Sequence, residues 1–145
     1  MLGERVQFVT QEEQLGTGHA VMMAKEALAN KQGTTIIMLG DMPLVDSKVI
    51  DKMFRYHKDR NNDLTVLTTK FDNPKGYGRI VRSEDGIIES IVEHIDCTDE
   101  QKLIKEVNTG IYVVDNKLLF EAVDKIQVNA KKEELDSLKR ITLVQ

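Results

Sequence analysis

Cysteine is nearly absent from the sequence: Cys97 stands alone, so the chain cannot form an internal disulfide. The sequence also shows no signal peptide and no apolar run long enough to cross a membrane. Secreted proteins commonly carry paired cysteines, and membrane proteins need long apolar segments. We therefore expect a cytoplasmic protein with no membrane partner.

Positive charge is not concentrated anywhere in the sequence. The net charge is −4, and the acidic and basic residues are interspersed along the chain. There is neither a basic stripe, nor the aromatic pattern of an RNA-recognition motif, nor zinc-finger spacing. These absences argue against a polymeric nucleic acid as a partner.

The two common phosphate-binding motifs are missing as well. A P-loop ends in Gly-Lys-Ser/Thr, and no such triplet occurs in the chain. The glycine-rich stretch Gly16–Val21 departs from the dinucleotide fingerprint, because its sixth position is Val21 instead of glycine. Any nucleotide bound here must be held in another way.

The residues that are present suit one soluble α/β domain, at 145 residues with 41% hydrophobic and 30% charged. Apolar periodicity alternates between strand and helix, which predicts a mixed, mainly parallel sheet with helices on both faces. Gly86 favours a hairpin, so we expect an antiparallel insertion. Strands are predicted over 5–10, 34–39, 63–69, 78–82, 87–93 and 107–114; helices over 19–30, 46–57, 98–101 and 116–126; and a charged tail, helical around 131–141 and without a strand partner, over 127–145.

The stretch "QEEQLGTGHA" (11–20) is placed between a predicted strand and a predicted helix. Its amides, with backbone N–H groups around Gly16 and Thr17, offer the donors and acceptors that match the edge of a uracil ring. A simpler interpretation is a strand–helix turn shaped by Gly16 and Gly18, with Thr17 capping the helix. The stretch alone leaves both open.

Asp41 follows a predicted buried strand in "IIMLGDMPLV". Ligands bind beyond the carboxyl ends of parallel strands, so this carboxylate could hold Mg²⁺ against phosphates. The alternative is an Asx turn organised by Asp41 and Pro43.

Three further stretches combine turn glycines with polar residues: "NPKGYGRIV" with Gly78, "IVEHID" with Glu93, and "VNTGIY" with Asn108 and Gly110. Glu93 and Asn108 have side chains that suit sugar hydroxyls and an acetamido group. Taken singly, Glu93 also fits a solvated charge, Asn108 a satisfied buried amide, and Gly78 a turn residue. We interpret His19, His57 and His94 as packing, helix-start or exposed residues.

In this order, "QLGTGHAV", "LGDMPLV", "NPKGYGRIV", "IVEHID" and "VNTGIYVVD" resemble one family. It is the N-terminal uridylyltransferase domain of bacterial bifunctional N-acetylglucosamine-1-phosphate uridylyltransferase / glucosamine-1-phosphate acetyltransferase. The resemblance runs from about residue 6 to about residue 126. It implies a Rossmann-like, GT-A-like nucleotide-diphospho-sugar transferase fold.

The resemblance also implies a reaction and a site. UTP and N-acetylglucosamine 1-phosphate would give UDP-N-acetylglucosamine, a precursor in peptidoglycan and cell-wall synthesis, and pyrophosphate, with Mg²⁺ as cofactor. No protein nucleophile is needed for such a transfer. The implied residues are Gln11, Gly16 and Thr17 at uracil; Leu39 and Gly40 along the nucleotide; Asp41 as the catalytic metal ligand; and Gly78, Glu93 and Asn108 at the sugar.

The sequence departs from this family at both ends. It lacks the first strand with the glycine-rich "L-x-A-G-x-G-T-R-M" loop, and a second metal ligand, an asparagine, would fall beyond Gln145. We expect a partial nucleotidyltransferase domain over 1–126, followed by a divergent tail over 127–145. The isolated chain is expected to be inactive or nearly so. Alternatives are a non-catalytic UDP-sugar-binding remnant and an interaction module, including a homo-oligomer, that pairs through an exposed sheet edge.

Overall fold

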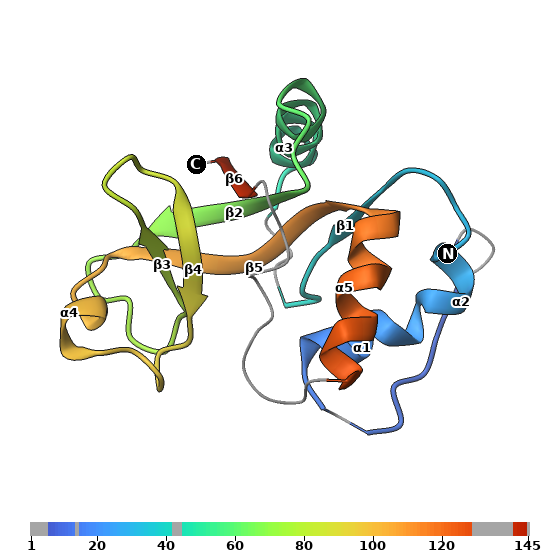
Figure 1. The fold of residues 1–145 in the computed structure, drawn as a ribbon, viewed down its shortest axis with the longest axis horizontal. Coiled ribbons are helices and arrows are strands. Elements are labelled where there is room, and N and C mark those ends of the chain that lie inside the picture. Colours follow the sequence, from blue (N-terminus) through green and yellow to red (C-terminus); the bar gives the residue numbers. More distant parts are fainter. Residues whose placement is uncertain (1–5, 14, 42–44, 129–140, 145) are drawn as a thin grey trace.

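The computed structural model describes residues 6–13, 15–41, 45–128 and 141–144. These residues form one six-stranded sheet with helices packed against it (Figure 1). The strands are β1 (Thr34–Ile37), β2 (Leu64–Lys70), β3 (Arg79–Arg82), β4 (Ile88–Val92), β5 (Glu106–Asp115) and β6 (Ile141–Val144). The helices are α1 (Thr17–Met23), α2 (Lys25–Leu28), α3 (Ser47–Asp59), α4 (Asp99–Lys102) and α5 (Asn116–Val128).

Strand β5 lies at the centre of the sheet and is antiparallel to β1, β2 and β3. The expected mainly parallel sheet is therefore wrong for the described strands, where only β2 and β6 pair in parallel. The strand–helix–strand pattern of β1, α3 and β2 does make β1 and β2 run in the same direction. However, β5 separates them, so each pairs with β5 instead of with the other.

Helices cover both faces of the sheet, as the sequence predicts. On one face, α5 contributes Leu119, Phe120 and Val123 to a core with β2 and β5, against which residues of α1 and α2 also pack. On the other face, α3 buries Met53 against Ile111 and other residues of β5. Figure 1 shows α3 on one side of the sheet and α5 with α1 on the other.

Most predicted elements are confirmed to within a few residues. Asp46 caps α3 by accepting the Lys48 N–H at 3.1 Å. Thr98 and Gln101 form the predicted capping box of α4. The helix predicted over 19–30 consists of two short helices, with Ala24 between them as the C-cap of α1 and the N-cap of α2.

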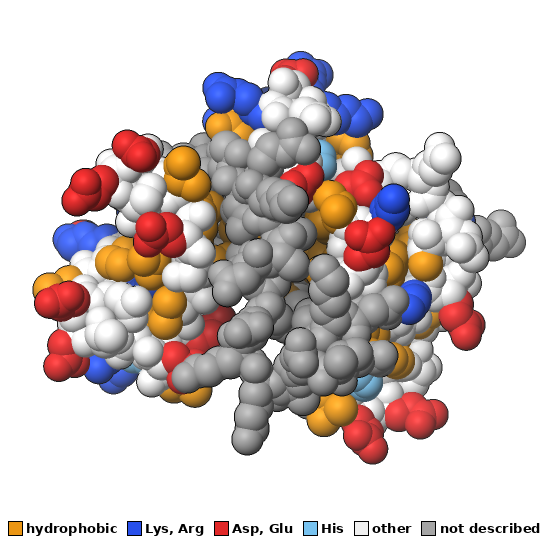
Figure 2. Space-filling view, in the orientation of Figure 1, with side chains coloured by type: hydrophobic (Ala, Val, Ile, Leu, Met, Phe, Trp, Pro, Cys, Tyr) orange, Lys and Arg blue, Asp and Glu red, His pale blue; other side chains and the backbone are white. Residues whose placement is uncertain are grey.

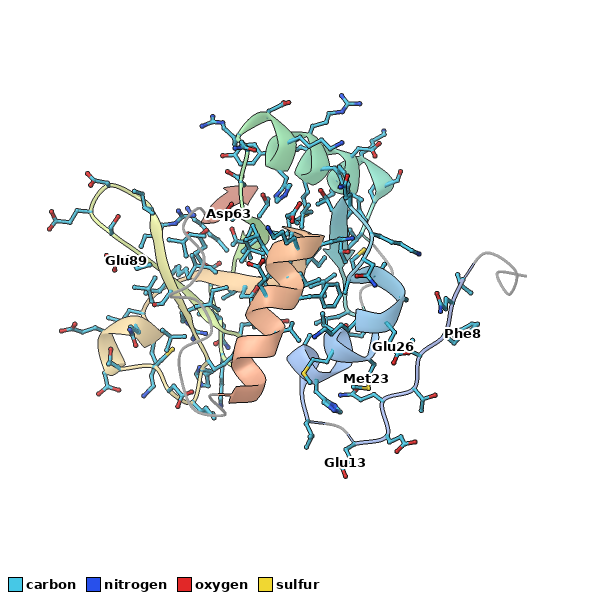
Figure 3. All side chains as sticks on the ribbon, turned by 45° about the vertical axis from the view of Figure 1, so that its right-hand side comes forward. Phe8, Glu13, Met23, Glu26, Asp63 and Glu89 are labelled. Carbon is cyan, nitrogen blue, oxygen red and sulfur yellow. The ribbon has the colours of Figure 1, made fainter. Side chains whose placement is uncertain are left out.

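Two predictions at the ends of the sequence are wrong. Residues 6–10 are not a strand, and Phe8 is 82% exposed on a segment that lies away from the sheet (Figure 3). The alternation of Val6 and Phe8 suits a strand, but no described strand pairs with this segment. In the tail, Ile141–Val144 forms β6 beside β2, so the expectation that the tail has no strand partner is wrong. The helix expected around 131–141 falls almost entirely on residues 131–140, which lie outside the described ranges.

Acidic and basic side chains are both spread over the visible surface, and lysine and arginine side chains gather over α3 (Figure 2). In the part of the chain that the structure describes, the helices are all too short or too polar to span a bilayer.

Candidate functional site

A groove of about 740 Å³ runs along β1 and the start of α1. This volume falls in the range of small-molecule sites, roughly 300 to 1,000 Å³. Its wall includes all five residues that the resemblance assigns to the nucleotide: Gln11, Gly16, Thr17, Leu39 and Gly40. Apolar side chains of α1, α2 and β1 complete the lining. The structure thus brings together two predicted segments that lie more than twenty residues apart in the sequence.

The side chain of Gln11 is oriented by two acceptors. Its Nε2 donates to the Gly16 carbonyl at 3.2 Å and lies 3.0 Å from Nδ1 of His19. A carboxamide nitrogen has two hydrogens, and both are engaged here. The Gln11 oxygen therefore remains available as an acceptor, and donors to a ligand can come from backbone N–H groups and the Thr17 hydroxyl.

Gly16 shapes the turn into α1. It occupies the N-cap position with φ 103°, a value that favours glycine. Thr17 is the first residue of the helix, so it is not the cap that the simpler interpretation assigned to it. Thr17 is exposed and lines the groove, where its backbone and hydroxyl can meet a ligand.

Asp41 is exposed just beyond β1 and Gly40, and residues 42–44 next to it lie outside the described ranges. Within those ranges, no three His, Cys, Asp or Glu side chains are close enough to hold a metal ion. Magnesium usually takes one or two carboxylates and completes its coordination with phosphate oxygens and water. The described residues thus offer no complete metal site, and Asp41 suits Mg²⁺ only together with a phosphate ligand.

A distortion in β5 shapes the second part of the site. The register between β2 and β5 shifts here, since Val66 pairs with Tyr112 and Thr68 pairs with Asn108. A step of two residues along β2 therefore corresponds to a step of four residues along β5. Gly110 lies in this bulge with φ 77°, and the Thr109 hydroxyl donates to the Leu67 carbonyl at 2.7 Å. Bulges bend a strand and redirect side chains, commonly beside functional sites.

The three predicted sugar residues meet beside this bulge. The Asn108 N–H donates to the Gly78 carbonyl at 2.9 Å. Gly78 is buried, and a Cβ atom there would lie 3.1 Å from Oε1 of Glu93. Gly78 therefore lies next to both polar residues, Asn108 of β5 and Glu93 just after β4.

Leu39 joins the groove to this cluster. A Cβ atom on Gly110 would lie 2.8 Å from Cδ1 of Leu39, so the two segments are in close contact. Gly110 in turn donates its N–H to Oδ1 of Asn108 at 3.0 Å. A series of contacts thus links the nucleotide residues to the sugar residues, although Gly78, Glu93 and Asn108 are not part of the groove lining.

Arg79 lies directly behind the sugar cluster and is 1% exposed. Its Nη1 donates to the Tyr77 carbonyl, and its Nη2 lies 3.4 Å from Nδ1 of His94. Its Nε has no hydrogen-bond partner in the described structure. Arg79 links the turn before β3 to the turn after β4, which carry Gly78 and Glu93.

His57 belongs to the core and not to the site. It lies on the buried face of α3, with Nδ1 3.0 Å from the Thr65 hydroxyl. Burial lowers the pKa of His57, and the negative charges of Asp115 and Asp63 only partly oppose this shift. The structural interpretation of this histidine is confirmed.

The sequence did not reveal the supporting residues His19, Arg79 and Tyr112. Each contacts a predicted site residue or the turn beside it: His19 meets Gln11, Arg79 holds the Tyr77 carbonyl, and the Tyr112 hydroxyl accepts from Asn108. All three do lie inside quoted motifs: His19 in "QLGTGHAV", Arg79 in "NPKGYGRIV" and Tyr112 in "VNTGIYVVD". That position was their only signal, because contacts between side chains depend on the fold.

Comparisons with known proteins identify relatives of the chain. The chain is similar to "Bifunctional protein GlmU" of Acholeplasma laidlawii, with 52% identity over 131 residues, covering 90% of this chain and 28% of that protein. The protein of the same name from Halalkalibacterium halodurans is 51% identical over 128 residues, covering 88% and 28% respectively. The protein of the same name from Limosilactobacillus reuteri is 52% identical over 125 residues, covering 86% of this chain and 28% of that protein. The chain thus spans less than a third of the length of these relatives.

The sequence model of the family described as "Nucleotidyl transferase" matches residues 2–143, which is nearly the whole chain. This match and the relatives confirm the family resemblance that the five sequence motifs indicate. The chain belongs to the nucleotidyl transferase family.

Proposed function

We propose that the chain is part of a uridylyltransferase that forms UDP-N-acetylglucosamine and pyrophosphate from UTP and N-acetylglucosamine 1-phosphate. The observation that carries this proposal is the series of contacts from the groove of Gln11, Gly16 and Leu39, through Gly110, to Asn108 and Gly78. Its two ends would hold the base and the sugar of one nucleotide-sugar. The "GlmU" name of the relatives supports the same assignment.

The base would lie at the α1 end of the groove. The Gln11 oxygen would accept the N–H of uracil, since both hydrogens of its amide are engaged within the protein. Backbone N–H groups around Gly16 and Thr17 would donate to the uracil carbonyls. Purines present a different hydrogen-bonding edge, which these groups would not match.

The sugar would lie against Gly78, with Glu93 at its hydroxyls and Asn108 at its acetamido group. The absence of a side chain on Gly78 leaves space beside Glu93, because a Cβ atom would meet its carboxylate. Asn108 and Glu93 would bind and orient the sugar without reacting. Their role is positioning, which supplies much of the rate in such transfers.

The reaction would be an in-line displacement. An oxygen of the sugar 1-phosphate attacks the α-phosphorus of UTP, and the bond to the β-phosphate breaks, so that pyrophosphate leaves with the electron pair. Asp41 would hold Mg²⁺, which neutralises charge on the phosphates when it is bound. The complete domain would have the GT-A-like arrangement, with further strands beyond β1.

Competition calorimetry tests this assignment. UDP-N-acetylglucosamine should bind more tightly than UDP-glucose, and both more tightly than ADP-glucose. Asn108→Ala should abolish the preference for the acetylated sugar and keep the preference for uracil, while Gln11→Ala should do the reverse. Equal affinity for all three nucleotides would contradict the proposal.

The free side of β1 favours a second candidate function. Among the described strands, β1 pairs only with β5, which leaves its other edge without a neighbour. Unpaired edges are templates for pairing with another strand. Under this alternative, the chain is an interaction module, and two copies of it associate through β1. Sedimentation equilibrium would detect the dimer, and Ile36→Pro in β1 should dissociate it; a monomer at all concentrations would rule it out.

A further inference from the structure

Hydrogen bonds hold the side-chain amide of Asn108 at both ends. The Gly110 N–H donates to Oδ1 at 3.0 Å, and Nδ2 donates to the Tyr112 hydroxyl at 2.6 Å. A backbone N–H can only donate, so the atom facing Gly110 must be the oxygen and the nitrogen must face Tyr112. The chemistry of the partners therefore fixes the orientation of the amide.

The β5 bulge permits this contact within one strand. Residues four positions apart in a regular strand are separated by roughly 13 Å. Here β5 accommodates two extra residues against β2, and Gly110 adopts φ 77°. The resulting bend directs the Asn108 and Tyr112 side chains toward each other, so their contact is a product of the bulge.

The Tyr112 ring is itself held in place. It packs against the core cluster that α5 forms with β2 and β5. Its backbone lies between Ile37 of β1 and Val66 of β2, both of which pair with position 112. The hydroxyl is thus carried by a ring at the centre of the sheet, and it acts as a fixed acceptor for the amide.

The amide retains capacity for a ligand. A carboxamide can make four hydrogen bonds, two as donor and two as acceptor. The described structure uses one of each for Asn108. One N–H and one oxygen lone pair remain, and they complement the C=O and N–H of an acetamido group.

We propose that Tyr112 is a positioning residue that holds the Asn108 amide in the orientation that selects an N-acetylated sugar. This inference rests on the proposed function, in which Asn108 meets the acetamido group. Without the hydroxyl, only the bond from Gly110 restrains the amide. The terminal torsion of asparagine is broad, so the amide would then sample other orientations.

Tyr112→Phe in the full chain tests the inference, because it removes one oxygen and leaves the ring. Calorimetry with UDP-N-acetylglucosamine, UDP-glucose and ADP-glucose gives two ratios, one for the sugar and one for the base. The preference for the acetylated sugar should fall roughly three- to tenfold, the loss expected for one hydrogen bond. The preference of UDP-glucose over ADP-glucose should not change. Tyr56→Phe on α3, whose ring contacts Arg60, is the matched control and should leave both ratios unchanged.

An equal loss for all three nucleotides would mean that Tyr112 acts only on the fold, and it would overturn the inference. An undiminished sugar preference in Tyr112→Phe would overturn it as well. If the parent chain itself shows no preference for the acetylated sugar, the proposed function fails, and the selective role of Tyr112 fails with it.

A second measurement addresses the positioning contact without any ligand. In a ¹⁵N-labelled chain, the Asn108 side-chain NH₂ signals, assigned by their loss in Asn108→Ala, should move in Tyr112→Phe and not in Tyr56→Phe. The chemical shifts of the two NH₂ protons should also become more similar in Tyr112→Phe, because one proton loses its fixed hydrogen-bond acceptor. Unchanged Asn108 signals would overturn the inference whatever the chain binds.

Discussion

Leu39 occupies the space that a side chain on Gly110 would need, because a Cβ atom there would lie 2.8 Å from its Cδ1. This contact joins the groove along β1 to the polar cluster beside β5. Glycine at position 110 thus lets Leu39 pack against β5 at the point where the two parts of the site meet.

Replacing Gly110 with alanine should destabilise the chain for two reasons. The backbone has φ 77°, which costs an alanine roughly 1–2 kcal/mol, and the new methyl group would collide with Leu39. Gly86→Ala is the control, since Gly86 has φ 78° but no atom within 4 Å of its Cβ position. Urea unfolding should show a larger loss of free energy for Gly110→Ala. Equal losses would show that contact with Leu39 does not matter.

Metal binding should depend on nucleotide, because Asp41 belongs to no group of three or more possible metal ligands in the described structure. Titration of the chain with Mg²⁺ alone should produce no measurable heat. With UTP present, Mg²⁺ should strengthen nucleotide binding, and Asp41→Asn should weaken this effect. Asp46→Asn, at the N-cap of α3, is the control and should leave it unchanged. Tight binding of Mg²⁺ to the chain without UTP would contradict the predicted single-carboxylate site.

The stability of the chain should fall in mild acid because of His57. Burial lowers the pKa of His57 below its ordinary value of 6.5, so the unfolded chain binds a proton more readily than the folded chain. Stability is therefore unaffected above pH 6.5, falls as the pH drops through that value, and levels off below the folded pKa. The free energy of unfolding should lose this dependence in His57→Gln. If the free energy of unfolding depends on pH in the same way in His57→Gln and in the parent chain, His57 is not the group responsible.

Glu106 should contribute to stability by joining three strands. From β5 it accepts from Arg82 of β3 at 2.9 Å through both carboxylate oxygens and from Thr68 of β2 at 2.8 Å. Glu106→Gln should cost about 1–3 kcal/mol, since hydrogen bonds to a buried charge are lost. Asp99→Asn removes the exposed pair with Lys102 and should have little effect. Equal losses of thermal stability in Glu106→Gln and Asp99→Asn would contradict the predicted contribution of Glu106.

Local signals in the sequence predicted the local features of the fold well. Capping patterns identified the starts of α3 and α4 at Asp46 and Thr98. The direction of strand pairing was predicted wrongly, because β5 lies between β1 and β2 and nothing in their own residues indicates this. The alternation of Val6 and Phe8 led to a wrong prediction of a strand over these residues, because a strand requires a pairing partner as well as an alternating pattern.

The same distinction applies to the candidate site. Motif residues such as Gly16, Gly78 and Asn108 could be recognised from their order in the sequence. The contacts that orient them could not, because Tyr112 reaches Asn108 only through the bulge at Gly110. Such contacts depend on the register between strands, which a single sequence does not specify.

The central claim is that one surface holds both the base and the sugar of UDP-N-acetylglucosamine. A ¹H–¹⁵N NMR titration of the chain with this nucleotide-sugar tests it most directly. The backbone signals of Gly16, Thr17 and Gly40 should shift together with those of Gly78, Asn108 and Gly110, while UMP should shift only the first group. If the same signals respond equally to ADP-glucose, or if UDP-N-acetylglucosamine shifts neither group, the account is contradicted.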